Sequence, residues 1–332
     1  MNYLYYDSGT TNTRLYLFRE NMLLDSLNVP IGSKDSALYG SNQKLLQTLK
    51  QMMDELCCKN QIKPDQISEI WMSGMISSPT GIIEIPHLTV PIDLYTLSHN
   101  VFEYYEPIYF KRLLYIIPGV KTNCDSPSVE SFPLINNMRG EETEIFGILQ
   151  TYKNFAENCI MIMPGSHTQI VFIENGAITN IISTITGELY SAVKNNTILS
   201  TALSEASSVK INPEMLCKGY ENLHKYGFNR ALYTVRTMEL FTPCTAIDRH
   251  SYFEGILNAD VLNVTIRFSK GHAFNNVVVY GSNESIDIFK ILFKKYYPRY
   301  FFTGISSNQK LPFSANGFLE IKSCKSLQYH IY

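Results

Sequence analysis

The chain has 332 residues, of which 45% are hydrophobic, and its 28 basic and 30 acidic residues leave a net charge of −2. A chain of this length usually forms two domains, and the balanced charge gives no support to nucleic acid or a membrane surface as a partner. The apolar runs are too short to span a bilayer, and no basic leader precedes them. We therefore expect a cytoplasmic protein without nucleic-acid or membrane partners.

The cysteines point to a reducing compartment. There are seven of them, an odd number at irregular spacing, and no C-x-x-C pair occurs. A zinc site of the usual ligand spacing is therefore not expected, and neither is a framework of disulfides.

The first motif is the segment Asp7-Ser8-Gly9-Thr10-Thr11-Asn12-Thr13-Arg14 between two aromatic runs, Tyr3–Tyr6 and Leu15–Phe18. Both runs favour strands, so the segment is a turn between them. An ordinary hairpin turn explains the glycine and the asparagine. The loop nevertheless carries more hydroxyl and amide donors than a turn needs, which favours a grip on phosphate oxygens. Asp7 beside it would then hold a magnesium ion through water.

The rest of the first half predicts a mixed sheet covered by a helix. Residues 23–29 and 70–72 read as strands, and apolar residues recur at helical spacing over 43–59. A loop of small residues, Ser73–Ser78, follows. Half of the 14 prolines then fall between residues 79 and 137. We interpret this stretch as an insertion of short strands and loops that caps a site.

The second half repeats the first. After Met138–Thr143 and a helix to about residue 152, strands are expected at 159–163, 169–173 and 177–182, with the loop Pro164–Thr168 between the first two. The turn Asn175-Gly176 is a strong hairpin signal. A mainly helical stretch over 188–263, a strand at 277–280 and a helix at 286–297 complete it. Two halves that each begin with a phosphate-type hairpin predict a duplicated α/β domain with a boundary near residue 155.

Several enzyme classes lack their motifs here, because no P-loop, G-x-G-x-x-G, H-E-x-x-H or G-x-S-x-G sequence occurs. Ser166 and His167 are sequence neighbours on an extended stretch, so they point apart and do not form a nucleophile pair. Gly281-Ser282, between a strand and a helix, is either an ordinary turn or a rest for the base and sugar of a nucleotide.

These motifs, in this order, resemble the 2-dehydro-3-deoxygalactonokinase family of the sugar kinase, heat-shock-70 and actin superfamily. The resemblance is carried by Asp7–Arg14, Ser73–Ser78, Met138-Arg139-Gly140-Glu141-Glu142-Thr143, Pro164-Gly165-Ser166-His167 and Thr186-Gly187-Glu188-Leu189. It implies an α/β fold with two ribonuclease-H-like (actin-type ATPase) domains and a central ATP cleft. Residues 1–155 would form the phosphate-loop and sugar-acid domain, with the insertion at about 79–137. Residues 156–332 would form the nucleotide domain.

Two departures from the family pattern stand out. The family often has Trp where this chain has Ser8, and residues 300–332 have no clear match to the usual ending. Contacts to the nucleotide base are therefore not assigned in that ending.

The resemblance also implies a reaction, the transfer of the γ-phosphoryl group of ATP to the terminal hydroxyl of a 2-keto-3-deoxy sugar acid. The expected acceptor is 2-dehydro-3-deoxy-D-galactonate, which would become the 6-phosphate, with Mg²⁺ as the metal. Glu141 or Glu142 would be the base, with Glu141 preferred, and Arg139 would neutralise the substrate carboxylate or the transferring phosphoryl group. The other roles implied are as follows: magnesium at Asp7; nucleotide contacts at Gly9, Thr10, Thr11, Asn12, Arg14, Gly165, Ser166, His167, Gly281 and Ser282; sugar-acid contacts at Ser73, Gly74, Met75, Ser77, Arg139 and Glu188.

Three alternatives stay open. A kinase of another sugar or sugar acid on the same fold would change only the substrate. An actin-like filament former or a chaperone-type ATPase would use the same phosphate loops, although the insertion favours a substrate pocket. A sugar-responsive repressor is disfavoured because no helix-turn-helix segment precedes Asp7. A homodimer is compatible with all of these.

Overall fold

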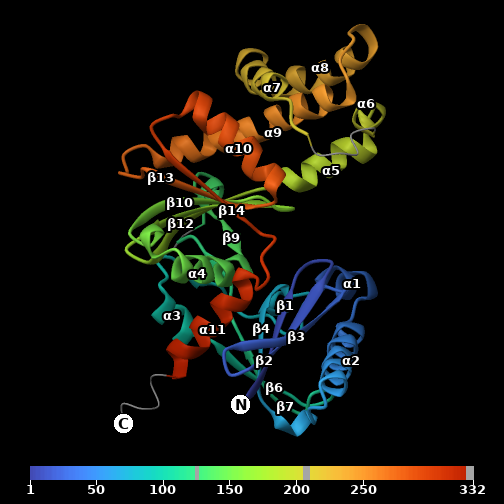
Figure 1. Ribbon diagram of the computed structural model, residues 1–332, viewed down its shortest axis with the longest axis vertical. Helices are drawn as coiled ribbons and strands as arrows, with labels where there is room; N and C mark the ends of the chain where they lie inside the picture. The colour runs from blue at the N-terminus through green and yellow to red at the C-terminus, as the bar shows by residue number, and fades with distance from the viewer. Residues whose placement is uncertain (124–126, 205–209, 327–332) are drawn as a thin grey trace. The chain divides into compact units, whose positions relative to one another are not determined.

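The computed structural model describes residues 1–123, 127–204 and 210–326. The chain divides into two compact units (Figure 1). Unit 1 comprises Met1–Glu157, Asn175–Asn180 and Gln309–Tyr332, and unit 2 comprises Asn158–Glu174 and Ile181–Asn308. The sequence had instead led us to expect one boundary near residue 155, with all of 156–332 in the second domain. The difference arises because the chain returns to unit 1 at its C-terminal end.

Unit 1 is built on a six-stranded sheet in the order β3-β2-β1-β4-β7-β6. Strand β1 runs antiparallel to β2, with Asp7 opposite Arg14, and parallel to β4, with Asp7 beside Ser73. The elements are β1 (Asn2–Ser8), β2 (Thr13–Arg19), β3 (Met22–Val29), α1 (Ser33–Tyr39), α2 (Gln43–Lys59), η1 (Pro64–Gln66), β4 (Ile67–Gly74), η2 (Met75–Ser77), β5 (Leu88–Thr89), α3 (Leu94–His99), β6 (Phe102–Glu106), β7 (Arg112–Ile116), β8 (Val120–Lys121), η3 (Phe132–Leu134), β9 (Asn137–Met138), α4 (Glu141–Thr151), η4 (Lys153–Phe155) and α11 (Phe313–Ser326).

The interpretation of residues 79–137 as an insertion is wrong for part of that stretch. Strands β6 and β7 belong to the main sheet, with β7 parallel to β4. Only the short strands β5 and β8, together with β9, form a separate three-stranded sheet. Frequent prolines hid the two long strands, because they broke the periodic pattern on either side. Residues 124–126 of this stretch lie outside the described part of the chain.

Unit 2 repeats the strand order of unit 1, with a five-stranded sheet in the order β12-β11-β10-β13-β14. Its first two strands are antiparallel, and β10, β13 and β14 run parallel, as β1, β4 and β7 do in unit 1. The elements, some shared with unit 1, are β10 (Asn158–Met163), β11 (Thr168–Glu174), β12 (Ala177–Thr184), α5 (Thr186–Asn196), α6 (Ser200–Ser204), α7 (Pro213–Tyr226), α8 (Phe228–Phe241), α9 (Ala246–Ser269), β13 (Asn276–Gly281), α10 (Asn283–Tyr296) and β14 (Phe301–Ser306).

This repetition confirms the predicted duplication of a ribonuclease-H-like α/β unit. The expected strands and the long helices are present, and Asn175 and Gly176 adopt positive φ angles at the predicted turn. Three further elements, α1, β14 and α11, were not predicted from the sequence. Residues 205–209 of the expected helical stretch and 327–332 of the ending lie outside the described residues.

The alternation of side chains along β1 and β2 gives the sheet of unit 1 two apolar faces. Leu4, Tyr6, Leu15 and Leu17 share one hydrophobic cluster with the apolar stripe of α2. On the other face, Phe318 of α11 stacks on Tyr5 at a ring-centroid distance of 4.8 Å. Helix α11 therefore covers the face that α2 leaves open, although it begins about 250 residues after α2 ends.

Each unit contains a pair of helices that cross on reciprocal glycines. In unit 1, a Cβ on Gly317 of α11 would lie 1.8 Å from the carbonyl oxygen of Thr143, and one on Gly147 of α4 would lie 2.1 Å from that of Phe313. In unit 2, Gly219 of α7 and Gly255 of α9 make the same kind of approach, each at 2.0 Å. Such distances leave no room for any side chain, so these backbones touch directly. In Figure 1 the ribbon of α11 passes next to that of α4 at an angle.

We predict that Gly317→Ala destabilises the protein although alanine is the better helix former. The helix-propensity gain is about 1 kcal/mol, whereas overpacking against a backbone costs about 1–3 kcal/mol, here at the upper end. The free energy of unfolding in urea should therefore fall by roughly 1–2 kcal/mol. Ser323→Ala, at an exposed position of the same helix, is the matched control and should change it little. A Gly317→Ala protein as stable as the parent would contradict this packing.

Candidate functional site

Three backbone segments meet at the carboxyl ends of β1 and β4, and glycine is what lets them meet. Gly74 ends β4 at φ +81°, and a Cβ there would lie 2.4 Å from the carbonyl oxygen of Ser8. Gly140, at φ +107° just before α4, would place a Cβ 3.2 Å from the Cα of Gly74. Both positive φ angles favour glycine. The structure thus brings together three predicted clusters, those of Asp7–Arg14, Ser73–Ser78 and Arg139–Thr143.

The loop after β1 is a tight turn tied to the start of α1. The amide of Gly9 donates to the carbonyl oxygen of Asn12 at 2.8 Å, so it is already used within the turn. The amides of Ser33 and Lys34 donate to the carbonyls of Gly9 and Thr10 at 3.3 and 3.0 Å. The side chains of Thr10, Thr11 and Asn12 are exposed. The loop therefore offers hydroxyl and amide side chains to a ligand, and the N–H of Gly9 serves the turn.

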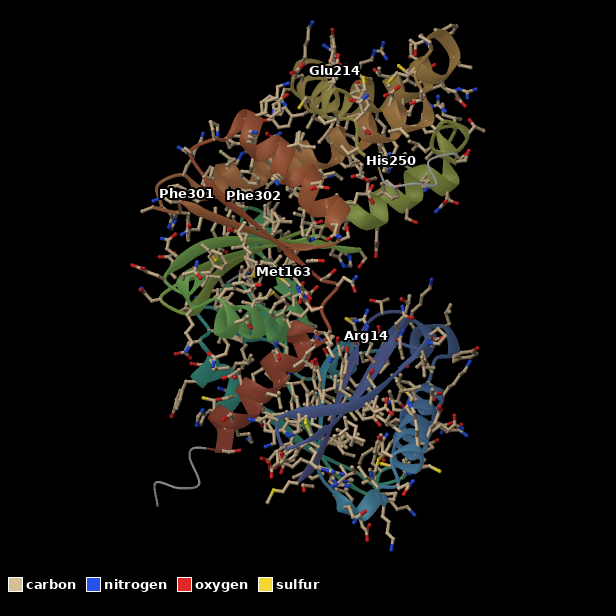
Figure 2. All side chains as sticks on the ribbon, in the orientation of Figure 1. Arg14, Met163, Glu214, His250, Phe301 and Phe302 are labelled. Atoms are coloured by element: carbon tan, nitrogen blue, oxygen red, sulfur yellow. The ribbon has the colours of Figure 1, made fainter. Side chains whose placement is uncertain are left out.

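Asp7 is the acid at this strand end. Its Oδ2 accepts a hydrogen bond from the Ser314 hydroxyl at 3.1 Å and lies 3.6 Å from Nη1 of Arg14, which is 56% exposed (Figure 2). Burial raises the pKa of Asp7, and Arg14 and Ser314 partly offset that shift. Within the described ranges, no group of three or more His, Cys, Asp or Glu side chains could hold a metal. One carboxylate suits Mg²⁺, which keeps several waters and takes phosphate oxygens as further ligands.

The two adjacent glutamates of α4 differ in their surroundings. Glu142 is fully buried, and both of its carboxylate oxygens accept the Gly140 amide at 2.8 Å. Glu141 has a buried oxygen, Oε2, without a hydrogen-bond partner among the described residues. Burial raises the pKa of Glu141 to about 7, and burial with the charge of Glu141 raises the pKa of Glu142 to about 8. Glu142 therefore shapes the turn, and Glu141 has a carboxylate oxygen to offer.

The guanidinium of Arg139 is held by groups that follow β4 in the chain. Its Nη1 donates to Oγ of Ser77 at 2.7 Å, and its Nη2 donates to the carbonyl of Ile85 at 2.8 Å and lies 3.3 Å from Nδ1 of His87. Burial, helped by the Arg139 charge, lowers the pKa of His87 to about 4, so this imidazole is neutral. His87 was not predicted as a site residue, because a single histidine in a proline-rich stretch carries no motif.

The remaining predicted sugar-acid residues of unit 1 are mostly buried. The hydroxyl of Ser73 is within 2.6 Å of the Tyr5 hydroxyl, and that of Ser77 donates to the carbonyl of Gly74 at 3.1 Å. Met75 is partly exposed. Glu188 lies in unit 2, where its carboxylate is 3.6 Å from Nε2 of His167. Its described contacts therefore place it with the second hairpin loop.

That second loop is built like the first. Glu188 near the start of α5 donates its amide to the carbonyl of Ser166 at 3.0 Å. A Cβ on Gly187 would lie 2.1 Å from the carbonyl oxygen of Gly165, just as one on Gly32 would lie 2.5 Å from that of Gly9. In both units a glycine at the helix start lets the hairpin loop rest on the helix. Gly281 lies against this loop as well, since its Cβ would be 3.4 Å from Cδ of Pro164.

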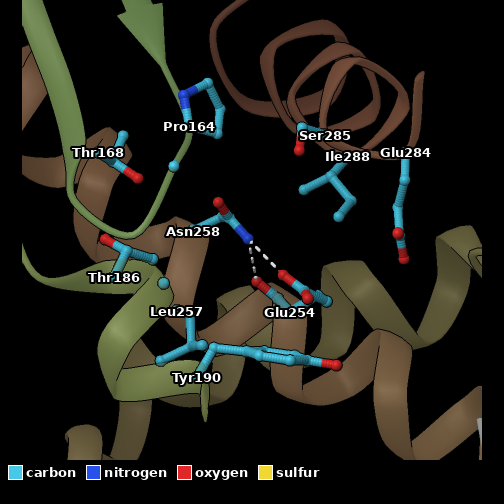
Figure 3. Close-up of a pocket in the computed structure, with 12 residues that line it drawn as sticks. Pro164, Thr168, Thr186, Tyr190, Glu254, Leu257, Asn258, Glu284, Ser285 and Ile288 are labelled. Atoms are coloured by element: carbon cyan, nitrogen blue, oxygen red, sulfur yellow. Dashed lines mark hydrogen bonds between the residues drawn. The ribbon is translucent and has the colours of Figure 1, made fainter. Parts of the chain in front are cut away.

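A pocket of about 190 Å³ opens beside these residues in unit 2 (Figure 3). One side presents the loop and the start of α5, and the other presents α9 and α10. Ser282 begins α10 by accepting the amide of Ser285 at 3.1 Å. The pocket is lined by Pro164, Gly165, Thr168, Thr186, Gly187, Tyr190, Glu254, Leu257, Asn258, Glu284, Ser285 and Ile288.

The α9 and α10 side of the pocket carries titratable groups that the sequence analysis did not identify. Asn258 donates to Oε2 of Glu254 at 2.8 Å, and Nε2 of His250 lies 3.6 Å from Glu254 and 4.0 Å from Glu284 (Figures 2 and 3). Tyr190 approaches the same imidazole nitrogen at 3.2 Å. Burial and the charge of Glu284 raise the pKa of Glu254 to about 7. The i, i+4, i+8 spacing of His250, Glu254 and Asn258 was the available signal.

Comparisons with known proteins agree with this architecture. A family model described as 2-keto-3-deoxy-galactonokinase matches residues 7–298. The 2-dehydro-3-deoxygalactonokinase of Escherichia coli (strain K12) is 24% identical over 201 residues, which cover 60% of this chain and 59% of that protein. The chain thus matches less than two thirds of that relative's length.

A solved structure extends the likeness of fold to the whole chain. It is the crystal structure of a "putative 2-dehydro-3-deoxygalactonokinase" from Sinorhizobium meliloti, with a TM-score of 0.75, 18% identity and coverage of 99% of this chain and 100% of that one. At this identity the likeness concerns the fold. In the described part of the chain, no helix is long and apolar enough to cross a membrane. Since the family model spans nearly the whole sequence, the chain belongs to the 2-keto-3-deoxy-galactonokinase family.

Proposed function

We propose that the protein is an ATP-dependent kinase that phosphorylates the terminal hydroxyl of a 2-keto-3-deoxy sugar acid, with 2-dehydro-3-deoxy-D-galactonate as the acceptor and its 6-phosphate as the product. Membership of the family supports this class of reaction. The observation that carries the proposal is the unpartnered oxygen of Glu141. A buried carboxylate oxygen that no protein group satisfies is costly unless a ligand uses it.

In this reaction Glu141 accepts the proton of the acceptor hydroxyl. A base is most effective when its pKa lies near the working pH, and burial raises that of Glu141 to about 7. Glu142 holds the Gly140 turn and so positions Glu141. Arg139, fixed by Ser77 and Ile85, presents a planar cation to the carboxylate of the sugar acid or to the transferring phosphoryl group.

Asp7 and the exposed side chains of Thr10, Thr11 and Asn12 serve the phosphate end of the reaction. Asp7 would hold Mg²⁺, which neutralises charge on phosphate oxygens when it is bound. The hydroxyls would bind phosphate oxygens directly. Arg14, paired loosely with Asp7, adds a cation at the start of β2, next to this loop. Little covalent chemistry is required of such a protein, so its residues act by positioning and charge.

The pocket of unit 2 is proposed as part of the nucleotide site because its two sides differ in charge. Thr168, Thr186 and the loop backbone form a neutral polar side that can face phosphate oxygens. Glu254 and Glu284 form an acidic side that repels anions but accepts hydrogen bonds from hydroxyls. The ribose hydroxyls would therefore face α9 and α10. The volume is below the roughly 300–1,000 Å³ of small-molecule sites, which fits part of a nucleotide.

The proposed reaction is tested by ADP release with Mg-ATP over a panel of 2-keto-3-deoxy sugar acids. We expect turnover with 2-dehydro-3-deoxy-D-galactonate and slower turnover with its epimers. The product should carry phosphate on its terminal hydroxyl, which phosphorus NMR resolves. Failure of every member of the panel would refute the assignment.

We predict that Glu141→Gln lowers kcat at least roughly tenfold, because a general base contributes about 10²–10⁴-fold. The parent kcat/KM should rise between pH 6 and 8, since the base works only when ionised and its pKa is raised to about 7. The variant should lose that rise. Stability is the internal control: a buried carboxyl with a raised pKa destabilises the fold as pH rises, so the variant should melt no earlier than the parent at pH 8.

Glu142→Gln is the matched comparison for that experiment, because the glutamine keeps an oxygen that can accept the Gly140 amide. It should retain the rise of kcat/KM with pH. A Glu141→Gln enzyme with the pH profile and kcat of the parent would show that Glu141 is not the base. Loss of the pH dependence in Glu142→Gln alone would show that Glu142 is the base.

We predict that Glu254→Gln raises KM for ATP roughly tenfold and narrows the preference for ATP over 2′-deoxy-ATP, because a hydrogen bond to a charged group contributes about 1.5–3 kcal/mol. KM for the sugar acid should not change. Glu214→Gln, at an exposed position of α7 in the same unit (Figure 2), is the control. Unaltered nucleotide kinetics in Glu254→Gln would exclude this orientation of the nucleotide.

A further inference from the structure

The C-terminal helix α11 reaches the acid of the first hairpin. The family model ends at residue 298, so this helix, Phe313–Ser326, lies wholly beyond the matched region. Ser314 in its first turn is 1% exposed, and its hydroxyl donates to Oδ2 of Asp7 at 3.1 Å. The two residues are 307 positions apart in the chain.

We propose that Ser314 is a positioning residue for Asp7, which makes the C-terminal helix a working part of the phosphate and metal site. This rests on the proposed function only through the role of Asp7. Ser314 does not touch the reacting atoms. It donates to Oδ2 and so fixes the direction of the carboxylate, whose other oxygen, Oδ1, would face a hydrated cation.

The other partner of Asp7 cannot supply this constraint. Nη1 of Arg14 is 3.6 Å away on a side chain that is 56% exposed. Such a pair contributes little, because solvent screens it and ordering the long side chain costs entropy. The Ser314 side chain is buried in a helix, so its hydrogen bond of 3.1 Å reaches the carboxylate from a fixed direction.

Helix α11 is itself held rigidly, so the position of Ser314 is well defined. Gly317 rests on the backbone of Thr143 in α4, and Phe318 stacks on Tyr5 with an angle of 4° between the rings. The same helix α4 begins at Glu141. Through its two contacts α11 holds the proposed metal ligand and the proposed base in one frame, both within unit 1.

Residues that orient a metal ligand typically contribute about 10–100-fold in metal affinity or activity. A purely structural serine would change stability without a selective effect on the metal. The two roles therefore separate in a binding measurement that needs no sugar acid and no turnover. Mn²⁺ is a suitable probe because its electron paramagnetic resonance signal reports the free ion directly.

The experiment measures Mn²⁺ binding to the full chain in the presence of ADP for the parent, Ser314→Ala and Ser314→Thr. We expect Ser314→Ala to weaken Mn²⁺ binding roughly tenfold or more and Ser314→Thr, which keeps the hydroxyl, to restore most of it. The Mg²⁺ concentration for half-maximal turnover should shift in parallel, while KM for the sugar acid stays constant. Ser323→Ala, at an exposed position of the same helix, should match the parent.

A double-mutant cycle with Asp7→Asn tests whether Ser314 acts through Asp7. In that background Ser314→Ala should cause no further loss of Mn²⁺ binding. Unchanged Mn²⁺ binding in Ser314→Ala, or an equal loss in the Asp7→Asn background, would overturn the proposal. Ser314→Cys, which keeps the volume, replaces the alanine variant if that fails to fold. If no sugar acid of the panel is phosphorylated but Ser314→Ala still weakens Mn²⁺ binding, the proposed function is wrong and this inference stands.

Discussion

The site in unit 1 depends on one steric constraint, the direct contact of three backbones at Ser8, Gly74 and Gly140. A single Cβ at Gly74 would come within 2.4 Å of the Ser8 carbonyl. This contact draws the end of β4 and the start of α4 onto the end of β1. Asp7 and Glu141 come close because Gly74 and Gly140, which lie at this contact, have no side chains. Residues more than a hundred positions apart in the sequence thereby meet at the end of β1.

Local signals made much of this predictable. The aromatic runs on both sides of Asp7–Arg14 and the Asn175-Gly176 turn describe hairpins by short-range physics alone, and the structure has both. Acids at the start of α4 match the helix dipole. The loops at 9–12 and 164–167, each between two strands, predict a duplicated α/β domain, and the resemblance to the kinase family implies that its halves are ribonuclease-H-like.

What could not be predicted is set by contacts between distant segments. Nothing in the sequence around Ser314 indicates that its hydroxyl reaches Asp7, since the contact depends on how α11 crosses α4 at Gly317 and Gly147. The acidic side of the unit 2 pocket was missed for a related reason. His250 and Glu254 sit inside a long helix whose pattern reads as ordinary packing, and their proximity to Glu284 comes from a separate helix.

The duplication also shows how the two hairpin loops differ. Both units join their first two strands by a four-residue loop, 9–12 in one and 164–167 in the other, and both rest that loop on a glycine at a helix start. The strands that lead into the loops differ. Strand β1 ends in Asp7 and Ser8, whereas β10 ends in Ile162 and Met163. A carboxylate suited to a hydrated cation therefore exists on only one of two matching strand ends. The two loops share one backbone arrangement, and the single acid supports the proposal that the metal binds beside the first of them.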